Sequence, residues 1–144
     1  MNRIRLVAHA VIRHRDRLLV TSGVDDGRTY YRCVGGGIEL GERSEQAVRR
    51  ELREELAVEL SRVELLDVIE NVFDFERERH HQIVFAFECE VAVPAFYARE
   101  RHDVVEGDHV IEQAFWVPLA EFVSGTKRLV PEGLLAVLTE TGSV

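Results

Sequence analysis

Apolar and polar residues alternate along much of the chain, in short runs separated by turn-forming residues. Alternation with a period of about two residues is typical of β-strands that bury one face. The segments with this pattern are Arg5–Arg13, Arg17–Ser22, Thr29–Gly37, Val63–Phe75, His81–Val93 and Glu112–Leu119. We therefore predict a strand at each of these segments.

Polar segments between the strands are predicted as loops. His14–Asp16 is a short polar turn, and Gly23–Arg28 is rich in Gly and Asp. Glu76–His81 is the expected loop of a hairpin, which places both of its histidines at the tip. Pro94–Val110 begins with a strand-breaking proline and carries several acids, so we predict a long loop there.

One stretch has the spacing of a long amphipathic helix. Val48, Leu52 and Leu56 recur at every fourth residue and form an apolar stripe. Ser44 is a suitable N-cap, and no Gly or Pro follows it within the stripe. We predict a helix over Ser44–Leu56.

Shorter helices are predicted near the end of the chain, each next to a proline that the first helical turn tolerates. They span Leu119–Gly125 and Glu132–Thr141. The resulting order is β-β-β-α-β-β-β-α-α, which is typical of a layered α/β domain. At 144 residues, without an internal repeat or a linker, the chain is expected to form a single domain over residues 1–144.

Acidic residues crowd one turn of the predicted long helix. At about 100° per residue, Glu51, Glu54 and Glu55 share an arc beside the apolar stripe. Like charges at these spacings repel, and acids late in a helix oppose its dipole. Hard cations such as Mg²⁺ or Mn²⁺ prefer carboxylate oxygens and often bridge a protein to substrate phosphates. The acids are therefore a candidate metal site.

An ordinary solvated helix is the competing interpretation. Arg49, Arg50 and Arg53 interleave with the acids, and Glu45 forms a favourable pair with Arg49. This interpretation does not account for the preceding glycine run, Gly35–Gly37, which suits a loop that approaches a ligand closely.

The stretch Gly36–Val58 resembles the signature of the Nudix hydrolase family. It reads GGIELGERSEQAVRRELREELAV, and the family pattern is G-x5-E-x7-R-E-U-x-E-E-x-G-U, where U is a bulky apolar residue. Every fixed position matches except the last glycine, which is Ala57. A second departure is Val34, where the family often has a proline before its glycines.

The resemblance implies an α/β/α sandwich with a mixed β-sheet and a divalent metal cofactor, Mg²⁺ or Mn²⁺. The residues that it implicates lie in the glycine loop and the helix: the carbonyl of Gly35 and the carboxylates of Glu51, Glu54 and Glu55 as metal ligands, Arg50 as the residue that orients a glutamate, and Gly36 and Glu42 in support.

Other candidate residues lie outside the signature. Members of the family often supply a further acid from a loop near Pro94–Val110, and Glu106 and Glu100 are the candidates here, with a plain solvated loop as the alternative. Arg32 is a candidate for pairing with phosphate and Tyr31 for stacking on a base, although burial within a strand also explains the tyrosine.

The reaction implied by the resemblance is metal-dependent hydrolysis of a diphosphate linkage in a nucleoside diphosphate derivative or a nucleotide. Such a transfer needs charge neutralisation, alignment and an activated water. Glu51 is the candidate general base, with a downstream loop acid as its rival. Marks of particular substrates are absent: position 74 is Asp, and no proline lies between Val58 and Pro94.

Composition limits the partners. A formal net charge of -8 argues against a nucleic-acid polymer and against a membrane surface, whereas a small phosphorylated substrate is compatible because metals reverse the local potential. Cys33 and Cys89 are too few for a disulfide framework and are expected as small apolar residues in strands. No signal peptide or membrane-length apolar run is found, so we expect a cytoplasmic protein; a homodimer is left open.

Two other functions are left open. A non-catalytic nucleotide-sensing or ligand-sensing domain would keep the fold, although the intact acids argue against it. Isomerisation of an isoprenoid diphosphate would need a cysteine in the pocket, and Cys33 lies close to the glycine run in sequence.

Overall fold

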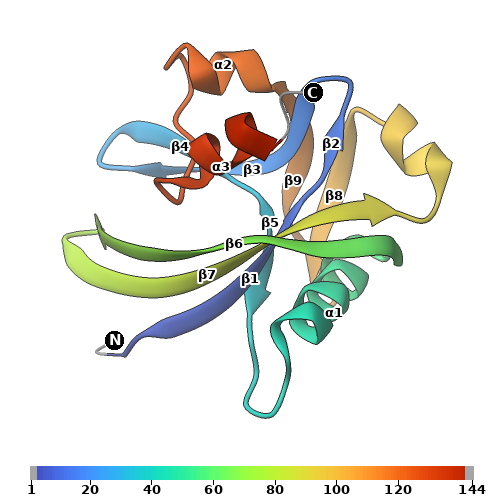
Figure 1. Cartoon of the computed structure of the whole chain (residues 1–144), viewed down its shortest axis with the longest axis horizontal. Helices are drawn as coiled ribbons and strands as arrows, with labels where there is room; N and C mark the ends of the chain where they lie inside the picture. Colours follow the sequence, from blue (N-terminus) through green and yellow to red (C-terminus); the bar gives the residue numbers. More distant parts are fainter. Residues whose placement is uncertain (1–2, 142–144) are drawn as a thin grey trace.

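Within residues 3–141, which the computed structural model describes, two β-sheets meet at the centre of the molecule (Figure 1). The strands of the first sheet are, in spatial order, β5 (Val34–Gly37), β1 (Arg5–Val11), β7 (Glu78–Val91) and β6 (Leu60–Phe75). The second sheet runs in the order β2 (Arg13–His14), β3 (Arg17–Asp25), β9 (His109–Pro118) and β8 (Arg101–Glu106), and β4 (Arg28–Arg32) pairs with β3.

The first sheet is mixed, because β1 runs parallel to β7 while its other pairs are antiparallel. Helix α1 (Ser44–Leu56) lies on one side of the sheets, and α2 (Leu119–Val123) and α3 (Leu134–Thr141) lie on the opposite side (Figure 1). This arrangement confirms the predicted α/β class with a mixed sheet between helices.

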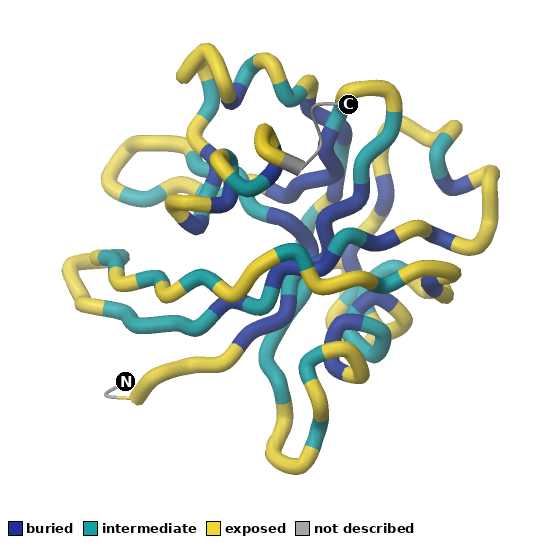
Figure 2. Tube along the Cα trace, in the orientation of Figure 1, coloured by how far each residue is buried: buried dark blue, intermediate teal, exposed yellow. Residues whose placement is uncertain are grey.

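Each helical layer has its own apolar core. Ala47, Val48 and Leu52 of α1 are fully buried against one side of the sheets. On the other side, Phe122 of α2 and Leu138 of α3 pack against the opposite faces of the same strands. Buried positions therefore concentrate where the sheets cross, while the far ends of the hairpins are exposed (Figure 2).

The predicted strand Thr29–Gly37 is divided at Cys33, which corrects the sequence prediction. Residues before the break form β4 in the second sheet, and residues after it form β5 in the first. The backbone of Tyr31 also bonds to residues 128 and 130, which draws β4 toward the C-terminal layer. Alternation cannot reveal such a change of partner, because both pieces keep an extended backbone.

The hairpin loops are shorter than predicted. Between β6 and β7 the turn is only Glu76–Arg77, and both residues have positive φ, 52° and 65°. Two-residue turns of this kind usually contain Gly or Asn, so the sequence carries no signal for it. His80 and His81 consequently lie within β7 rather than at a hairpin tip.

The prediction of a long loop at Pro94–Val110 is also wrong. It contains a 3₁₀ helix, η1 (Pro94–Ala98), the strand β8, and the start of β9. His102 and Val104 are buried while their neighbours in β8 are exposed, so a two-residue period is present after all. Charged residues on the exposed face concealed it.

Helix α1 begins and ends close to the predicted positions. Arg43, rather than Ser44, is the N-cap, and its backbone N–H donates to Gln46 Oε1 at 2.8 Å. The helix ends at Ala57, which has φ 56° and ψ 39° and donates its N–H to the carbonyl of Arg53. Ala57 thus adopts the left-handed conformation that glycine usually occupies at this position.

Candidate active site

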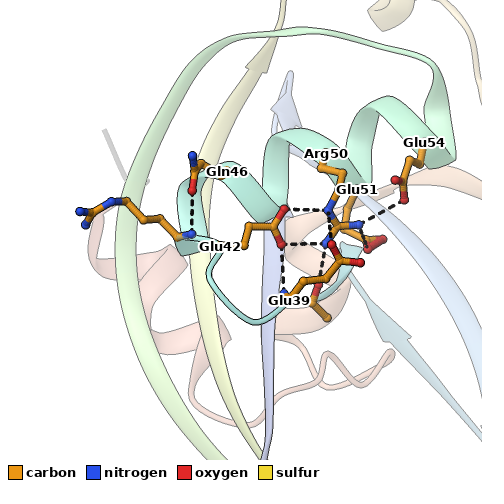
Figure 3. A network of polar contacts seen from close by, with 8 residues as sticks. Glu39, Glu42, Gln46, Arg50, Glu51 and Glu54 are labelled. Carbon is orange, nitrogen blue, oxygen red and sulfur yellow. Dashed lines mark hydrogen bonds and ion pairs between the residues drawn. The ribbon is translucent and has the colours of Figure 1, made fainter.

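Arg50 gathers the acids of the signature. Its Nε and Nη2 donate to the carboxylate of Glu42 at 2.7 and 3.0 Å. Its Nη1 donates to Glu51 at 2.9 Å and to Glu54 at 3.2 Å, and Nη2 also donates to the carbonyl of Gly37 at 2.9 Å. Figure 3 shows this network, in which one guanidinium joins the helix to the glycine loop.

The network is partly shielded from water. The side chains of Arg50, Glu42 and Glu51 are only 20%, 15% and 14% exposed. The hydrogen bond from Arg50 lowers the pKa of Glu42, and the same bond raises the pKa of Arg50. Glu42 is therefore ionised at neutral pH, and its charge fixes the orientation of the arginine.

The glycines of the loop leave room for the acids and for a neighbouring strand. A Cβ on Gly36 would lie 2.4 Å from Oε1 of Glu51. Gly35 has φ 155°, and a Cβ there would lie 2.1 Å from the carbonyl oxygen of Ala8 in β1. The loop therefore requires glycine at Gly35, whose backbone lies directly against β1, while a side chain at Gly36 would displace the carboxylate of Glu51.

Glu55 is in a different electrostatic situation from the acids bound by Arg50. Its pKa is raised to about 8, chiefly by burial and also by the nearby charge of Glu51, a hydrogen bond with Glu51 and the charge of Glu112. Arg32 only partly offsets this. Glu51 and Glu55 are thus two adjacent carboxylates with a deficit of positive charge, which a cation or a proton would relieve.

The three acids of the candidate metal site do not converge completely. Within residues 3–141, no group of three or more His, Cys, Asp or Glu side chains is gathered closely enough to hold an ion. The side chain of Glu54 is 59% exposed, and its carboxylate is bound by Arg50. Glu55 instead makes a hydrogen bond with Glu51. The structure brings Glu51 and Glu55 together and leaves Glu54 at the rim.

A cleft of about 700 Å³ opens beside these acids and is lined by both sheets. Arg32 and Glu106 line it, as does Tyr30, the neighbour of the predicted Tyr31. Its volume is in the range of small-molecule sites. The acids of α1 are therefore at the edge of a cavity that can hold a substrate.

Two candidate residues lie away from the cleft, in agreement with the alternatives given for them, burial for Tyr31 and solvent exposure for Glu100. Tyr31 packs against Phe115 and Phe122 in the second core, so its ring is not presented to a substrate. Glu100 is 75% exposed and pairs with Arg17 at 3.2 Å. Strand alternation turns the ring of Tyr31 away from the site, whereas Glu100 lies just before β8, outside any strand.

Sequence reasoning missed Glu112 and His9, which line the cleft. Glu112 lies 3.7 Å from Arg32 and acts electrostatically on Glu55. A signal for Glu112 existed, since it shares a face of its strand with buried Ala114. His9 pairs with Gly35 across two strands, and burial, followed by the charges of Arg32 and Arg5, lowers its pKa to about 4.

Cys33 and Cys89 are free and buried. Cys89 lies in β7 as expected, whereas Cys33 lies in the break between β4 and β5. Burial raises the pKa of the Cys33 thiol to about 12, so this residue is an inert apolar group at neutral pH. Cys33 lines the cleft, so the isomerase interpretation keeps its cysteine only as a buried, neutral thiol.

The fold and the site together define an α/β protein with an acid-rich cleft in which an arginine orients a glutamate. A family model described as the NUDIX domain matches residues 3–137, and the chain belongs to this family. Proteins of the family generally hydrolyse nucleoside diphosphate derivatives, which are small phosphorylated substrates, and they generally use divalent metal ions.

Solved structures of similar fold carry the same family description. A NUDIX hydrolase from Nitrosomonas europaea is 16% identical, with a TM-score of 0.68, and the match covers 98% of this chain and 90% of the other. A MutT protein from Methanosarcina mazei Go1 is 19% identical, with a TM-score of 0.60 and coverage of 97% and 94%. At these identities the likeness shows the fold alone.

A MutT NUDIX hydrolase from Burkholderia pseudomallei is 26% identical, with a TM-score of 0.53, over 83% of this chain and 86% of the other. A search of the curated proteins gives no match. In the part of the chain from residue 3 to residue 141, no helix is long and apolar enough to cross a membrane.

Proposed function

We propose that this protein hydrolyses a diphosphate linkage in a nucleoside diphosphate derivative or a nucleotide, with Mg²⁺ or Mn²⁺ as cofactor. The observation that carries the proposal is the position of Glu51, which Arg50 holds against Gly36 beside a second, partly buried carboxylate, Glu55. A solvated helix would not bury two adjacent acids at the edge of a cavity.

The donor set fits a hard divalent cation. Glu51 and Glu55 supply adjacent carboxylates, and the backbone of Gly35 and Gly36 supplies carbonyls in the same loop. The raised pKa of Glu55 reflects a shortage of positive charge at this point, which such an ion would remove. Glu54, at the rim, would join the ligands after its carboxylate leaves Arg50.

When bound, divalent ions neutralise the charge of a diphosphate and activate the attacking water. The side chains of the protein hold the reacting groups in position and accept the proton that the water loses. Arg50 keeps Glu51 in one position, and Glu51 is our candidate for the group that accepts a proton from water. Glu106 and Glu112, which line the same cleft, are its rivals.

Cationic side chains face the same cavity. Arg32 is 44% exposed, and within residues 3–141 its guanidinium has a single ion pair, at 3.7 Å, with Glu112. Its guanidinium is therefore free to bind a phosphate of the substrate in two-point fashion.

The test is release of phosphate or nucleotide from a panel of diphosphate compounds with Mg²⁺, with Mn²⁺ and with a chelator. We expect turnover only with metal, and we expect Glu54→Gln and Glu55→Gln to lower kcat by about 100-fold or more without loss of fold. The matched control is Glu59→Gln, because Glu59 binds Arg53 at the surface. Wild-type rates in both site variants would refute the metal assignment.

The same panel separates the alternative function. A non-catalytic sensing domain would bind nucleotides, as measured by calorimetry, and would release no product from any of them under either metal.

A further inference from the structure

Two hairpins that line the cleft are joined at their tips, and we infer that this junction holds the cleft walls at the spacing that binds the substrate, with Asp25 as the positioning residue. We call the junction the hairpin bridge. It consists of Asp25 and Tyr30 in the β3–β4 hairpin and of Phe75 and Glu76 in the β6–β7 hairpin. The inference rests on the proposed function, because it concerns how the substrate of that reaction is held.

Each hairpin supplies one wall of the cleft. Tyr30 and Arg32 line it from the β3–β4 hairpin, and Phe73 and Phe75 line it from the β6–β7 hairpin. The two hairpins belong to different sheets, and in Figure 1 they extend in the same direction from the centre of the molecule. The width of the cleft between them therefore depends on contacts that join one sheet to the other.

Both hairpins end in a tight two-residue turn. The turn residues are Asp26 and Gly27, with φ 52° and 74°, and Glu76 and Arg77, with φ 52° and 65°. In a β-turn, the carbonyl of the first residue accepts from the N–H of the fourth, so the N–H of the second residue has no partner inside the turn. The N–H of Glu76 is in this second position and needs an acceptor from outside its hairpin.

Asp25 supplies that acceptor. The N–H of Glu76 donates to Oδ1 of Asp25 at 3.1 Å. Asp25 is half-buried although it adjoins a turn, whereas its neighbour Asp26 is exposed. A hydrogen bond from a backbone N–H to a carboxylate is stronger than one between neutral groups. Asp25 thus ties the tip of the β6–β7 hairpin to the end of β3.

A ring contact supplements the hydrogen bond. Tyr30 meets Phe75 edge-on, with centroids 6.2 Å apart and an interplanar angle of 88°. Gly23 pairs with Tyr30 across β3 and β4, and a Cβ on Gly23 would lie 2.5 Å from the tyrosine hydroxyl oxygen. The tyrosine ring therefore lies across Gly23, where a larger side chain would displace it.

The inner end of the β3–β4 hairpin is held by other bonds. The N–H of Tyr31 donates to the carbonyl of Arg128 at 2.9 Å, and the carbonyl of Tyr31 accepts from the N–H of Val130 at 2.8 Å. These bonds hold β4 beside Arg32, the candidate phosphate ligand. Loss of the hairpin bridge should therefore release the outer end of the wall and leave Arg32 in place.

The hairpin bridge is far from the acids of α1. Gly37 and Val84 lie in one row of the first sheet, because both pair with Val7. Phe75 pairs with Glu78, which is six residues from Val84 along β7, or about 20 Å at the usual rise of a strand. The bridge should therefore affect the binding of groups that extend beyond the diphosphate, and leave the chemical step unchanged.

The expected size of the effect follows from the population of the binding conformation. When the bridge is intact, the walls are at the binding spacing before the substrate arrives, which lowers the cost of binding. Without the bridge, the walls have this spacing for only a fraction of the time, and the apparent Kd rises by the inverse of that fraction. Loss of one partly exposed hydrogen bond corresponds to about a fivefold change.

Hydrogen exchange of the protein without ligand tests the bridge itself. Asp25→Ala removes the acceptor and should speed exchange of the Glu76 amide about fivefold or more, as followed by NMR. Asp25→Asn keeps an acceptor oxygen and should exchange as the wild type does. Asp26→Asn is the matched control, because it removes the same charge one residue away without touching the hydrogen bond.

Calorimetry with two non-hydrolysable probes tests the effect on the cleft. Adenosine 5′-(α,β-methylene)diphosphate extends beyond the diphosphate position, whereas methylenediphosphonate mimics the diphosphate alone. With Mg²⁺ present, Asp25→Ala should weaken the nucleotide probe about fivefold and leave methylenediphosphonate unchanged. Asp25→Asn and Asp26→Asn should not weaken either probe.

A second variant breaks the bridge at the ring contact. Gly23 is not among the glycines with positive φ, so its backbone accepts alanine, and Gly23→Ala should move the Tyr30 ring away from Phe75. We expect weaker binding of the nucleotide probe, in the same direction as for Asp25→Ala. Thermal unfolding checks the fold of every variant.

The sign of the effect separates the bridge from a simple charge effect. Loss of a negative charge near an anionic probe would by itself strengthen binding, and it would do so in Asp25→Ala, Asp25→Asn and Asp26→Asn alike. The inference is overturned if Asp25→Asn weakens the nucleotide probe as much as Asp25→Ala, or if Asp25→Ala leaves amide exchange and binding unchanged. It is also overturned if the wild type does not bind the nucleotide probe.

Steady-state hydrolysis distinguishes this inference from the proposed function. With a substrate found by the hydrolysis panel, Asp25→Ala should raise KM about fivefold and leave kcat unchanged. Hydrolysis with an unchanged KM in Asp25→Ala would support the proposed function and overturn the bridge. Binding that depends on Asp25, in a protein that hydrolyses nothing, would support the bridge and refute the hydrolysis.

Discussion

Adjacent acids in one helical turn have different electrostatic environments. Glu51 and Glu54 share the guanidinium of Arg50, whereas Glu55 has only Arg32, a more distant cation, to offset the charge of Glu51. Position in the sequence does not distinguish the three carboxylates. Which of them holds a proton at neutral pH depends on where the single well-placed arginine donates its hydrogen bonds.

A change of Glu55 to Gln should therefore have a pH-dependent effect on stability. The folded-state pKa of Glu55 lies above its usual value of 4.5, so its contribution is present at low pH and is lost as the pH rises toward about 8. Without metal, Glu55→Gln should become more stable relative to the wild type as the pH rises through this range. Thermal unfolding at about pH 5 and about pH 8.5 with a chelator measures the effect.

Glu59→Gln is the control for this experiment, because Arg53 lowers the pKa of Glu59 and moves its titration below the tested range. An equal difference in Tm between Glu55→Gln and wild type at both pH values would show that burial does not control Glu55.

At the scale of single elements, α1 and the glycine loop work as one unit. The helix supplies the acids, and the glycines of β5 leave space for the carboxylates because they have no side chains. The C-terminus of the helix departs from the family pattern, since Ala57 adopts a left-handed conformation. Alanine in this conformation is strained, because its Cβ approaches the following carbonyl.

Ala57→Gly should relieve that strain. We expect the free energy of unfolding to rise by about 1 kcal/mol, or Tm by about 2–4 °C, with no change in kcat. Ala47→Gly, at a buried position in the first turn of the same helix, should instead destabilise the protein by about 1 kcal/mol or more. Chemical denaturation of both variants measures the difference, and a loss of stability in Ala57→Gly would contradict the conformation found here.

At the scale of the whole molecule, the cleft exists only because two sheets meet. The acids come from α1, Arg5 and His9 from β1, Arg32 from β4 and Glu112 from β9. These groups lie far apart in the sequence and approach one another through strand pairing. The protein also has a formal net charge of -8, which attracts cations. Within the cleft, they are attracted most to Glu51 and Glu55, whose charges are not balanced by nearby arginines.

Divalent metal should therefore stabilise the folded protein. At a concentration of about 100 times its Kd, Mg²⁺ would add about 2.7 kcal/mol to the free energy of unfolding, because it binds only the folded state. The measurement is Tm with increasing MgCl₂ at constant ionic strength. The shift should be absent in a variant that combines Glu51→Gln with Glu55→Gln. An equal shift in that variant would place the ion elsewhere.

The sequence was sufficient to predict the elements whose formation depends on residues close to one another along the chain. Helix α1 has the predicted bounds, because its apolar stripe lies within one stretch of chain, although its N-cap is Arg43 rather than Ser44. The signature residues were identified for the same reason, since their spacing is local. Most strands were predicted too, because alternation reports a buried face without reference to any partner.

Tertiary structure decided everything that depends on partners distant in the sequence. Alternation does not say which strands pair, so it missed the change of sheet at Cys33 and the strand β8 within the predicted loop. Sequence reasoning also left open whether Tyr31 contacts the substrate or is buried, and it overlooked Glu112, because neighbouring positions differ only in the face they occupy. The sequence alone determined the acids and their helix, whereas the register between strands determined which other side chains meet them, because register is a property of pairs of segments.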